Sequence, residues 1–529
     1  MPVHAPRQSL RGRPSVSADA AASASQSGRG ARGRRLSRIL RATALLIAGA
    51  LVVAIATSWI SSQRAPVYSA MAMGVADIGN GATVVGGDGH AHDPAAGPDG
   101  GSVSVSELIE DPHRSDDVHV ELTARAESIV LAGGERVDAF TLNGTTPGPE
   151  IRAAQGELIE VVLRNEDVAG GVTLHWHGVD VPAAMDGVAG VTQDAVRPSE
   201  AFTYRFVAED AGSYWYHSHQ LSHAQVLGGL FGALVIEPAD GLVVDDVAAL
   251  LHTYPGTSRT LTGMSGEVAH DAAVGSTARV RLINTDNAAT AAWVSGASFL
   301  VVAVDGTELR EPTPVHAAKL LLTAGGRIDL EVVVPATGAV RVQAPGVSIV
   351  LGPSDTAPPS QPAPDRFLDL LDYGSPAPPA FDPAQPDRSF TYDIGRAPGF
   401  LDGTPGIWWT INGRMGDDVP MYMVQEGDVV RMRISNASGE AHPMHLHGHH
   451  LLVLARDGVL ASGSPWWVDS LHVEHGESYD VAFVADNPGI WMDHCHNLPH
   501  ASEGLMTHLS YEGVTTPFLL GRDSGNEPE

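Results

Sequence analysis

Ten of the 24 histidines in this 529-residue sequence fall into four short groups, and one group encloses the only cysteine. Imidazole and thiolate side chains are the usual protein ligands of zinc and copper. Residues i and i+2 of a β-strand project from the same face, so a His-x-His pair can present two imidazoles to one ion. The four groups are His175-Trp-His177, His217-Ser-His219, His442-Pro-Met-His445-Leu-His447, and His494-Cys495-His496 followed by His500.

Ten histidines and one cysteine exceed the donor set of any single site, so the pattern predicts several metal ions. Structural zinc sites usually contain more thiolates or a closed set of four ligands. One thiolate with two imidazoles and a weak axial ligand suits a blue-copper centre, so copper fits best. A single cysteine also excludes an intramolecular disulfide bond.

With these motifs the sequence resembles the three-domain multicopper oxidases, the laccase-like family. The resemblance covers residues 118–515 and implies an all-β fold of three cupredoxin-like Greek-key β-sandwich domains with four copper ions per chain. It also implies that one-electron oxidation of phenolic, aromatic or metal-ion donors is coupled to the four-electron reduction of O2 to water. The matching motifs are Leu174-His-Trp-His-Gly178, Tyr214-Trp-Tyr-His-Ser-His219, His442-Pro-Met-His-Leu-His-Gly448 and Trp491-Met-Asp-His-Cys-His496.

The resemblance further implies three kinds of copper site. His442, Cys495 and His500 would bind the type 1 copper, which accepts electrons from the donor. His175 and His445 would bind the type 2 copper. The ligands of the type 3 pair would be His177, His217, His219, His447, His494 and His496. The type 2 and type 3 ions would form one three-copper cluster between the first and third domains, covalently linked to Cys495 through its two neighbours.

Two further positions follow from the same resemblance. Asp186 lies nine residues after His177, where the family places an acidic group near the cluster. It is expected to donate protons or to orient ligands, and the alternative is a turn residue before Gly187. The axial position of the type 1 copper falls on Leu505, or on Met506 if the loop is shifted by one residue. A leucine there would deprive the copper of a thioether and raise its potential.

Short β-type segments separated by Gly and Pro turns must position these ligands. Several alternate apolar with polar residues, as half-buried strands do, and long amphipathic helical stretches are scarce. Clear examples are residues 158–163, 202–207, 233–236, 278–283, 429–434 and 479–484. Many short strands at regular spacing predict β-sandwiches or barrels of ~100 residues each. Predicted domains are 118–240, 241–351 (without ligands) and 389–515, with a Pro-rich linker at 352–388 and a C-terminal tail at 516–529.

The N-terminal part differs in charge from the rest. Residues 1–72 contain ten arginines and one aspartate, a net charge of +9, so the remainder carries −39 of the overall −30. The basic segment 1–41 precedes an apolar segment, 42–60, close to the ~20 residues that span a bilayer as a helix. It is either an uncleaved membrane anchor, or an export signal with Arg34-Arg35 before it and a cleavage site near residues 70–72. Both alternatives predict an extracytoplasmic body.

Residues 61–117 are poor in large apolar side chains and are predicted to form a flexible linker. His90 and His92 lie in this linker and could bind metal, although we expect them to have no ligand role. Met415, Met421 and Met423 are close in sequence, and thioethers suit Cu(I). Methionines at such spacing are more typical of a core.

Other functional classes remain open beside the oxidase. The acidic composition argues against a nucleic-acid-binding protein. An extracytoplasmic copper-binding or copper-tolerance protein, either a cuprous oxidase or a copper carrier, is the main alternative. A carrier would need only the type 1 ligands, and a scaffold that had lost its copper would have eroded motifs. All eleven His and Cys positions are present. Copper nitrite reductases share the domain type but lack a type 3 pair.

Overall fold

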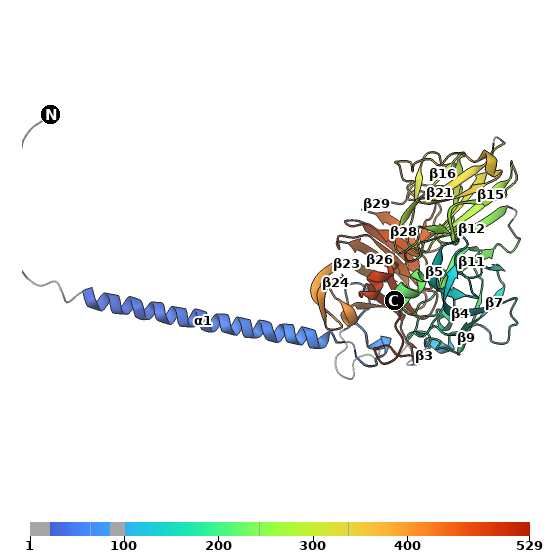
Figure 1. Ribbon diagram of the computed structural model, residues 1–529. Coiled ribbons are helices and arrows are strands. Elements are labelled where there is room, and N and C mark those ends of the chain that lie inside the picture. Colours follow the sequence, from blue (N-terminus) through green and yellow to red (C-terminus); the bar gives the residue numbers. More distant parts are fainter. Residues whose placement is uncertain (1–21, 64, 85–100, 243, 337) are drawn as a thin grey trace, which may run out of the picture. The chain divides into compact units, whose positions relative to one another are not determined.

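The computed structural model describes residues 22–63, 65–84, 101–242, 244–336 and 338–529, which belong to two compact units, Met1–Ser61 and Ser62–Glu529. The first unit contains the long helix α1 (Ala22–Ser61) (Figure 1). Its segment Arg35–Ser61 has 27 residues and a mean hydropathy of 2.3 in its most apolar stretch. None of that stretch is buried, and Leu45 and Leu46 are 74% and 75% exposed. The helix is therefore long and apolar enough to cross a membrane.

The second unit is mostly β-structure, which confirms the predicted fold class. All six segments predicted as strands are strands. The other helical elements of the described chain are single short turns. They are α2 (Ser222–Leu227), α3 (Leu498–Ser502), η1 (Ala70–Ala72), η2 (Val105–Glu107), η3 (Ala183–Met185), η4 (Ser354–Thr356) and η5 (Gly416–Asp418).

Residues 118–237 form two four-stranded sheets. The first has the order β5-β4-β7-β9 and the second the order β6-β11-β10-β8. The strands of the first sheet are β4 (Val118–Val130), β5 (Arg136–Leu142), β7 (Leu158–Asn165) and β9 (Ala201–Val207). Those of the second are β6 (Ile151–Ala154), β8 (His175–His177), β10 (Gly212–His217) and β11 (Phe231–Glu237). Two of the four histidine motifs therefore begin on adjacent strands of one sheet.

Residues 245–351 form one continuous sheet with the order β18-β17-β20-β15-β12-β13-β14-β22-β21-β16-β19. Its strands are β12 (Asp245–His252), β13 (Thr260–Leu261), β14 (Met264–His270), β15 (Thr277–Asn284), β16 (Thr290–Ser295), β17 (Phe299–Val304), β18 (Thr307–Glu308), β19 (Lys319–Leu322), β20 (Arg327–Val333), β21 (Val340–Ala344) and β22 (Val347–Leu351). This sheet carries none of the eleven predicted ligands.

Residues 388–515 supply most of two further sheets and one strand of a two-stranded ribbon, β3-β35, and the other strands are β1 (Val75–Asp77), β2 (Thr83–Val84) and β3 (Val103–Ser104). One sheet has the order β2-β1-β25-β34-β33-β27-β31, and the other has the order β24-β23-β26-β32-β28-β29 with β30 beside β28. The strands are β23 (Arg388–Leu401), β24 (Thr404–Ile411), β25 (Pro420–Val424), β26 (Val429–Asn436), β27 (His442–Leu446), β28 (Leu451–Arg456), β29 (Val459–Leu460), β30 (Trp467–Val468), β31 (Ser470–Val473), β32 (Ser478–Val484), β33 (Ile490–Cys495), β34 (Met506–Tyr511) and β35 (Val514–Thr515).

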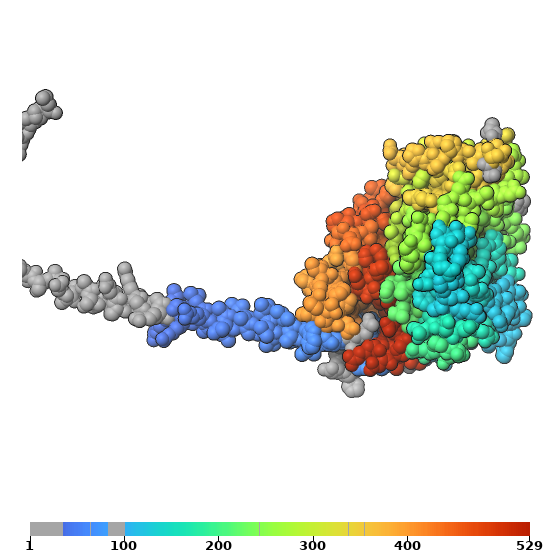
Figure 2. All heavy atoms as spheres, in the orientation of Figure 1, coloured from blue at the N-terminus to red at the C-terminus, as the bar shows by residue number. Residues whose placement is uncertain are grey.

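The three groups of strands follow the chain without exchange of strands among them, and they are in contact on the face shown in Figure 2. We propose that they are the three predicted domains. Figure 1 shows β4, β7 and β9 of the first group, β15, β16 and β21 of the second, and β23, β26 and β28 of the third in separate parts of the unit. We call them the first, second and third sheet groups.

The prediction of a flexible linker at residues 61–117 is wrong for part of that segment. Strand β1 (Val75–Asp77) pairs in parallel with β25, β2 (Thr83–Val84) extends the same sheet, and β3 (Val103–Ser104) pairs with β35. These pairings rest on backbone hydrogen bonds, which need few large side chains, so composition did not reveal them. His90 and His92 lie outside the described residues. The predicted C-terminal tail also packs on the body, because the Asn526 side chain accepts a hydrogen bond from the backbone N–H of Ala195 at 2.9 Å.

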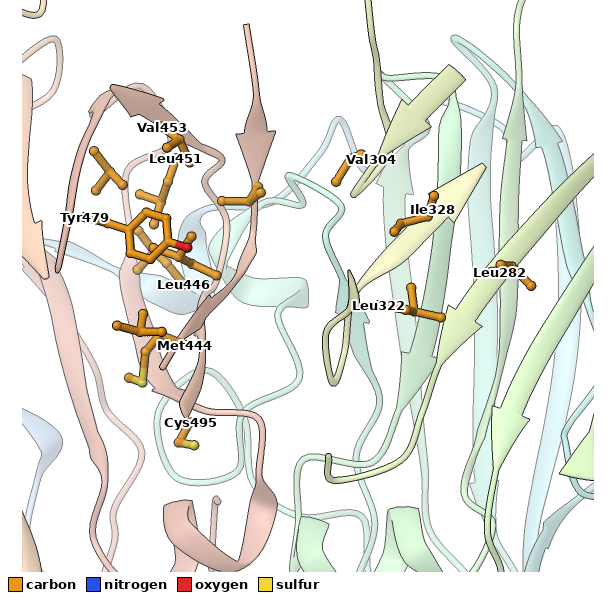
Figure 3. Close-up of a cluster of buried hydrophobic side chains, with 14 of the residues drawn as sticks. Leu282, Val304, Leu322, Ile328, Met444, Leu446, Leu451, Val453, Tyr479 and Cys495 are labelled. Carbon is orange, nitrogen blue, oxygen red and sulfur yellow. The ribbon is translucent and has the colours of Figure 1, made fainter. Parts of the chain in front are cut away.

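The core extends to the cysteine. Met444, Leu446 and Cys495 belong to one large cluster of buried side chains that also includes Leu322 and Ile328 of the second sheet group (Figure 3). Cys495 has no exposed surface. Met421 and Met423 are buried in the same part of the chain, as expected for core methionines.

Candidate metal centre

Strand register places the histidine motifs face to face. In the first sheet group, His175 is opposite His217 across the β8–β10 pair. In the third, His445 is opposite His494 across the β27–β33 pair, and Met444 is opposite Cys495. Because side chains alternate along a strand, His494 and Cys495 project from opposite faces of β33. One strand therefore serves two separate donor clusters.

The first cluster contains the predicted type 1 ligands. The Sγ atom of Cys495 lies 3.5 Å from Nδ1 of His442 and 3.8 Å from Nδ1 of His500, and the two Nδ1 atoms are 3.2 Å apart. All three residues are buried, with His500 the most exposed at 8%. The two imidazoles and the thiol thus present three donor atoms to one point, the donor set that suits a blue-copper centre.

The register also bears on the axial position. Met506 is opposite His494 in the β33–β34 pair, so its side chain lies on the His494 face of the sheet. Leu505 precedes it, and its carbonyl accepts a hydrogen bond from the backbone N–H of Cys495 at 3.1 Å. Leu505 is fully buried in the cluster that contains Cys495, whereas Met506 is partly exposed. This arrangement favours Leu505 beside the thiol.

The second cluster contains eight histidines from the first and third sheet groups, all of them buried. Nε2 of His175 lies 3.3 Å from Nε2 of His445, and Nε2 of His494 lies 3.2 Å from Nε2 of His447 and 3.3 Å from Nε2 of His219. The remaining members are His177, His217 and His496. The histidines predicted to bind the type 2 and type 3 coppers are therefore gathered in one place.

Hydrogen bonds on the outer side of the rings fix their tautomers. Nδ1 of His175 donates to the carbonyl oxygen of Asp186 at 2.9 Å, and Nδ1 of His445 donates to the carbonyl oxygen of Asp469 at 2.9 Å. Nδ1 of His494 similarly faces the carbonyl oxygen of Cys495 at 3.2 Å. A neutral imidazole with a proton on Nδ1 has its lone pair on Nε2.

These tautomers direct lone pairs at one another. The facing Nε2 atoms of His175 and His445 have no proton to share at 3.3 Å, so the arrangement calls for a cation between them. Among the described residues, both ring nitrogens of His496 and Nδ1 of His219 have no hydrogen-bond partner, although they are buried. Unpaired buried polar atoms are costly, and a bound metal would satisfy them. The donor set therefore fits metal ions, and nitrogen with a single sulfur fits copper.

Asp186 lies where it can hold two of these rings. Its carboxylate accepts from Nδ1 of His447 at 3.0 Å and lies 3.0 Å from Nδ1 of His175. The residue is fully buried at the C-terminal end of η3, whose turn follows Pro182. The structure thus gives the turn residue an orienting contact to one predicted ligand from the first sheet group and one from the third.

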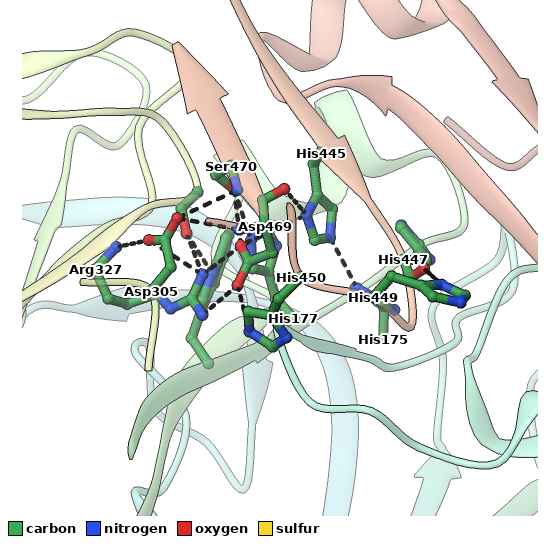
Figure 4. A network of polar contacts seen from close by, with 12 residues as sticks. His175, His177, Asp305, Arg327, His445, His447, His449, His450, Asp469 and Ser470 are labelled. Atoms are coloured by element: carbon green, nitrogen blue, oxygen red, sulfur yellow. Dashed lines mark hydrogen bonds and ion pairs between the residues drawn. The ribbon is translucent and has the colours of Figure 1, made fainter. Parts of the chain in front are cut away.

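Sequence reasoning missed a second carboxylate at the cluster. Asp469, between β30 and β31, accepts from Nε2 of His177 at 3.1 Å, and Figure 4 shows it among the cluster histidines. Its own partner is Arg327 of the second sheet group, at 2.6 and 2.5 Å through two N–H groups. No motif marks either residue, because their contact joins positions 142 residues apart.

Burial keeps the rings neutral. Desolvation, reinforced by the neighbouring imidazoles, lowers the pKa of His177, His217, His219, His445, His447 and His496 well below the usual value. It lowers the pKa of His442 and His494 to about 3. Burial also raises the pKa of the Cys495 thiol. At neutral pH these eight imidazoles are therefore ready to bind a metal, whereas the Cys495 thiol must first lose a proton.

A pH dependence of stability follows for the copper-free protein. The unfolded chain protonates these imidazoles below pH 6.5, whereas the folded chain resists protonation down to about pH 3 at His442 and His494. Stability should therefore be highest above pH 6.5 and fall as pH drops, by up to about 1.4 kcal/mol per pH unit for each such ring. Thermal unfolding of copper-free protein from pH 7.5 to 4.5 measures this. A melting temperature that stayed constant over that range would contradict it.

Comparison with known proteins identifies related chains. Residues 123–241 and 383–513 match two family models, each described as multicopper oxidase. The multicopper oxidase MmcO of Mycobacterium tuberculosis is 29% identical over 474 residues, covering 76% of this chain and 88% of that protein. Laccase-1 of Botryotinia fuckeliana is 28% identical, covering 71% of this chain and 78% of that protein. The crystal structure of a multicopper oxidase from Pseudomonas thermotolerans has a TM-score of 0.62 and 28% identity, covering 75% of this chain and all of that one.

Proposed function

This chain belongs to the laccase-like family of multicopper oxidases, and we propose that it holds four copper ions and couples one-electron oxidation of small donors to the reduction of O2 to water. One observation carries the proposal: eleven donor side chains form two clusters that are joined by the continuous segment 494–496. A four-electron reduction supplied by one-electron donors needs a store of electrons, and two linked clusters provide it.

We propose the following ligands. The type 1 copper would be held by His442, Cys495 and His500, with Leu505 beside it. The type 2 copper would be held by His175 and His445. The type 3 coppers would be held by His177, His217, His219, His447, His494 and His496. When bound, copper supplies reversible one-electron redox chemistry and a site for O2.

The chain itself contributes connection and orientation. Cys495 is covalently bonded to His494 and His496, so a through-bond path of one residue leads from the thiolate to either imidazole. Asp186 and Asp469 hold ring N–H groups, which fixes the lone pairs toward the cluster centre. Full burial of these rings excludes bulk water from their surroundings.

We propose that donors are oxidised at the edge of His500. Its Nε2 atom points away from the thiol and lies 3.5 Å from a carboxylate oxygen of Glu440, whose side chain is 49% exposed. Arg396 donates to the same carboxylate at 2.9 Å, and Trp409 packs against the His500 ring. A phenol that gives up an electron must also give up a proton, and Glu440 is placed to accept it.

The test of the proposed function compares donors on one preparation. Copper-loaded protein should consume oxygen with a phenol, an aromatic amine, Fe(II) or Cu(I), and the ranking would identify the donor class. Glu440→Gln should slow phenol oxidation and leave the copper content unchanged. Full copper loading without oxygen uptake from any donor would instead favour the alternative, a copper carrier.

A second prediction concerns the axial position. Replacing Leu505 with methionine should place a thioether beside the type 1 copper and lower its potential, because a weak sulfur ligand stabilises the oxidised ion. Redox titration of the blue absorption measures the shift. Met506→Leu is the control and should leave the potential unchanged. If Met506→Leu raised the potential and Leu505→Met had no effect, Met506 would be the axial residue.

A third prediction concerns Asp186. Asp186→Asn should reduce turnover by roughly 10–100-fold, because the amide is a weaker acceptor for the ring N–H groups of His175 and His447. The blue band should persist, since Asp186 does not contact the type 1 ligands in the described contacts. Oxygen uptake across a pH series measures the loss. Unchanged turnover at every pH would show that Asp186 is only a turn residue.

We also propose that α1 anchors the protein in a membrane or directs its export, with the body outside the cytoplasm. The positive-inside bias supports this orientation, because the arginines precede the apolar segment. Membrane fractionation and N-terminal sequencing of the mature protein distinguish an anchor from a cleaved signal.

A further inference from the structure

The second sheet group carries none of the copper ligands, yet one of its loops reaches the histidine cluster. Strands β19 and β20 are joined by residues 323–326, and Gly325 lies against two ligand rings. A Cβ atom on Gly325 would lie 2.8 Å from Cε1 of His177 and 2.9 Å from Cγ of His496. Its φ of +78° also suits glycine. The carbonyl oxygen of Gly325 accepts from Nε1 of Trp215, which lies beside the first-group ligands. This loop forms part of the wall of the cluster.

Arg327 begins β20 directly after this loop and is almost fully buried, at 1% exposure. Its two Nη atoms donate to the two carboxylate oxygens of Asp469 at 2.6 and 2.5 Å, a bidentate pair. Its Nε atom donates to the carbonyl oxygen of Ser213 on β10 at 3.0 Å. One guanidinium therefore joins all three sheet groups, as Figure 4 shows in part.

Asp469 transmits this contact to the ligands. Its carboxylate accepts from Nε2 of His177, and its carbonyl oxygen accepts from Nδ1 of His445. Asp305, also from the second sheet group, accepts from the backbone N–H groups of Asp469 and Ser470 at 3.3 and 3.2 Å. The backbone and side chain of Asp469 are thus both held by the sheet group that has no ligand.

The buried charge of Asp469 explains why Arg327 lies beside it. Asp469 is a buried carboxylate, and burying such a charge is costly unless a cation pairs with it. A displaced carboxylate would no longer accept from Nε2 of His177 in the observed geometry, and the Nδ1 lone pair of that ring would lose its direction. Arg327 supplies the bidentate cation, with the His450 ring at 3.5 Å as a weaker second neighbour, and Gly178 leaves room for the guanidinium, because a Cβ there would lie 2.1 Å from Nη2.

We infer that Arg327 is a positioning residue for O2 reduction, which acts through Asp469 to hold His177 and His445 in their metal-binding orientation. The inference rests on the proposed function, because it assigns the second sheet group a role in that same cluster. A residue that only joined the sheet groups would affect stability, whereas Arg327 should also affect the cluster. Arg281 provides the comparison, since it is equally buried, pairs with Asp329 at 2.9 Å and contacts Ser213, but among the described residues it touches no proposed ligand or ligand partner.

The test uses copper-loaded full-length Arg327→Gln, Arg327→Lys and Arg281→Gln. In Arg327→Gln we expect an unchanged blue band, an altered EPR spectrum of the type 2 copper, and a loss of roughly 10–100-fold in affinity for the cluster coppers and in turnover. Arg327→Lys should recover part of the loss, because it keeps the charge but not the two-pronged geometry. Arg281→Gln should lower the melting temperature and leave the EPR spectrum and copper content unchanged.

Several results would overturn the inference. One is a wild-type EPR spectrum and turnover in Arg327→Gln, and another is the same spectral change in Arg281→Gln, which would indicate a general packing effect. If Arg327→Gln fails to fold, Arg327→Lys decides by the same readouts. In a double variant with Asp469→Asn, the loss should be no greater than that of the poorer single variant, whereas additive losses would contradict action through Asp469. If the wild-type protein itself bound no cluster copper, the proposed function would fail first.

Discussion

Replacing Cys495 with serine should abolish the blue absorption and reduce oxygen uptake from every donor by more than roughly 100-fold. Loss of a residue that only orients a metal ligand costs up to about that much. The serine hydroxyl cannot provide the thiolate on which the blue-copper centre depends. Cys495 is also the residue bonded to both His494 and His496, so its sulfur begins the path to the histidine cluster. Absorption spectroscopy, copper analysis and oxygen uptake on the purified variant measure the three effects.

The cluster provides an internal control for this variant. Cys495→Ser leaves all eight cluster histidines unchanged. The type 2 EPR signal should therefore remain, and the copper content should fall by one ion per chain. Serine is close to cysteine in size, and the buried site should therefore stay folded, which circular dichroism checks. Persistent blue colour in the variant would show that the thiol is not a ligand, since the chain has no other cysteine.

In contrast to Cys495→Ser, His445→Ala should retain the blue band, and it should consume no oxygen. Nε2 of His445 lies 3.3 Å from Nε2 of His175, and the ring stacks on His177 at 3.7 Å between centroids. Removing it takes away a proposed type 2 ligand and opens the contact between two sheet groups. The type 1 donors Cys495 and His442 project from the other face of the sheet, so electrons should still reduce the blue centre without passing to O2. Anaerobic reduction followed by addition of oxygen measures this.

His252→Gln is the matched control for His445→Ala. His252 is also a buried histidine, but it bonds Thr285 and the carbonyl oxygen of Leu227, away from the cluster. Its replacement should lower stability and leave turnover per folded molecule close to the wild-type rate. Should His445→Ala still turn over at the wild-type rate, the assignment of the cluster would be wrong.

The histidine motifs could be predicted from sequence because short-range spacing determines their presentation. A His-x-His pair on a strand exposes two rings on one face whatever surrounds it, and the lone cysteine between His494 and His496 restricts the chemistry to a thiolate–imidazole site. The alternation of apolar and polar residues likewise predicted the strands, because it reflects burial of one face. The linker at 61–117 was predicted less well, since β1 and β3 are held by backbone pairing that composition does not record.

By itself the sequence determined the kinds of donor, their grouping and the all-β elements that carry them. Tertiary structure alone decided which groups meet: His175 with His445, Asp186 with His447, and Asp469 with both His177 and Arg327. For the axial position, the β33–β34 register places Met506 opposite His494, an observation that supports Leu505 but that spacing could not provide. The physical reason is that local spacing fixes only the face from which a side chain projects. Its partner depends on how separate sheets pack, and contacts such as Arg327 with Asp469 leave no periodic pattern in the chain.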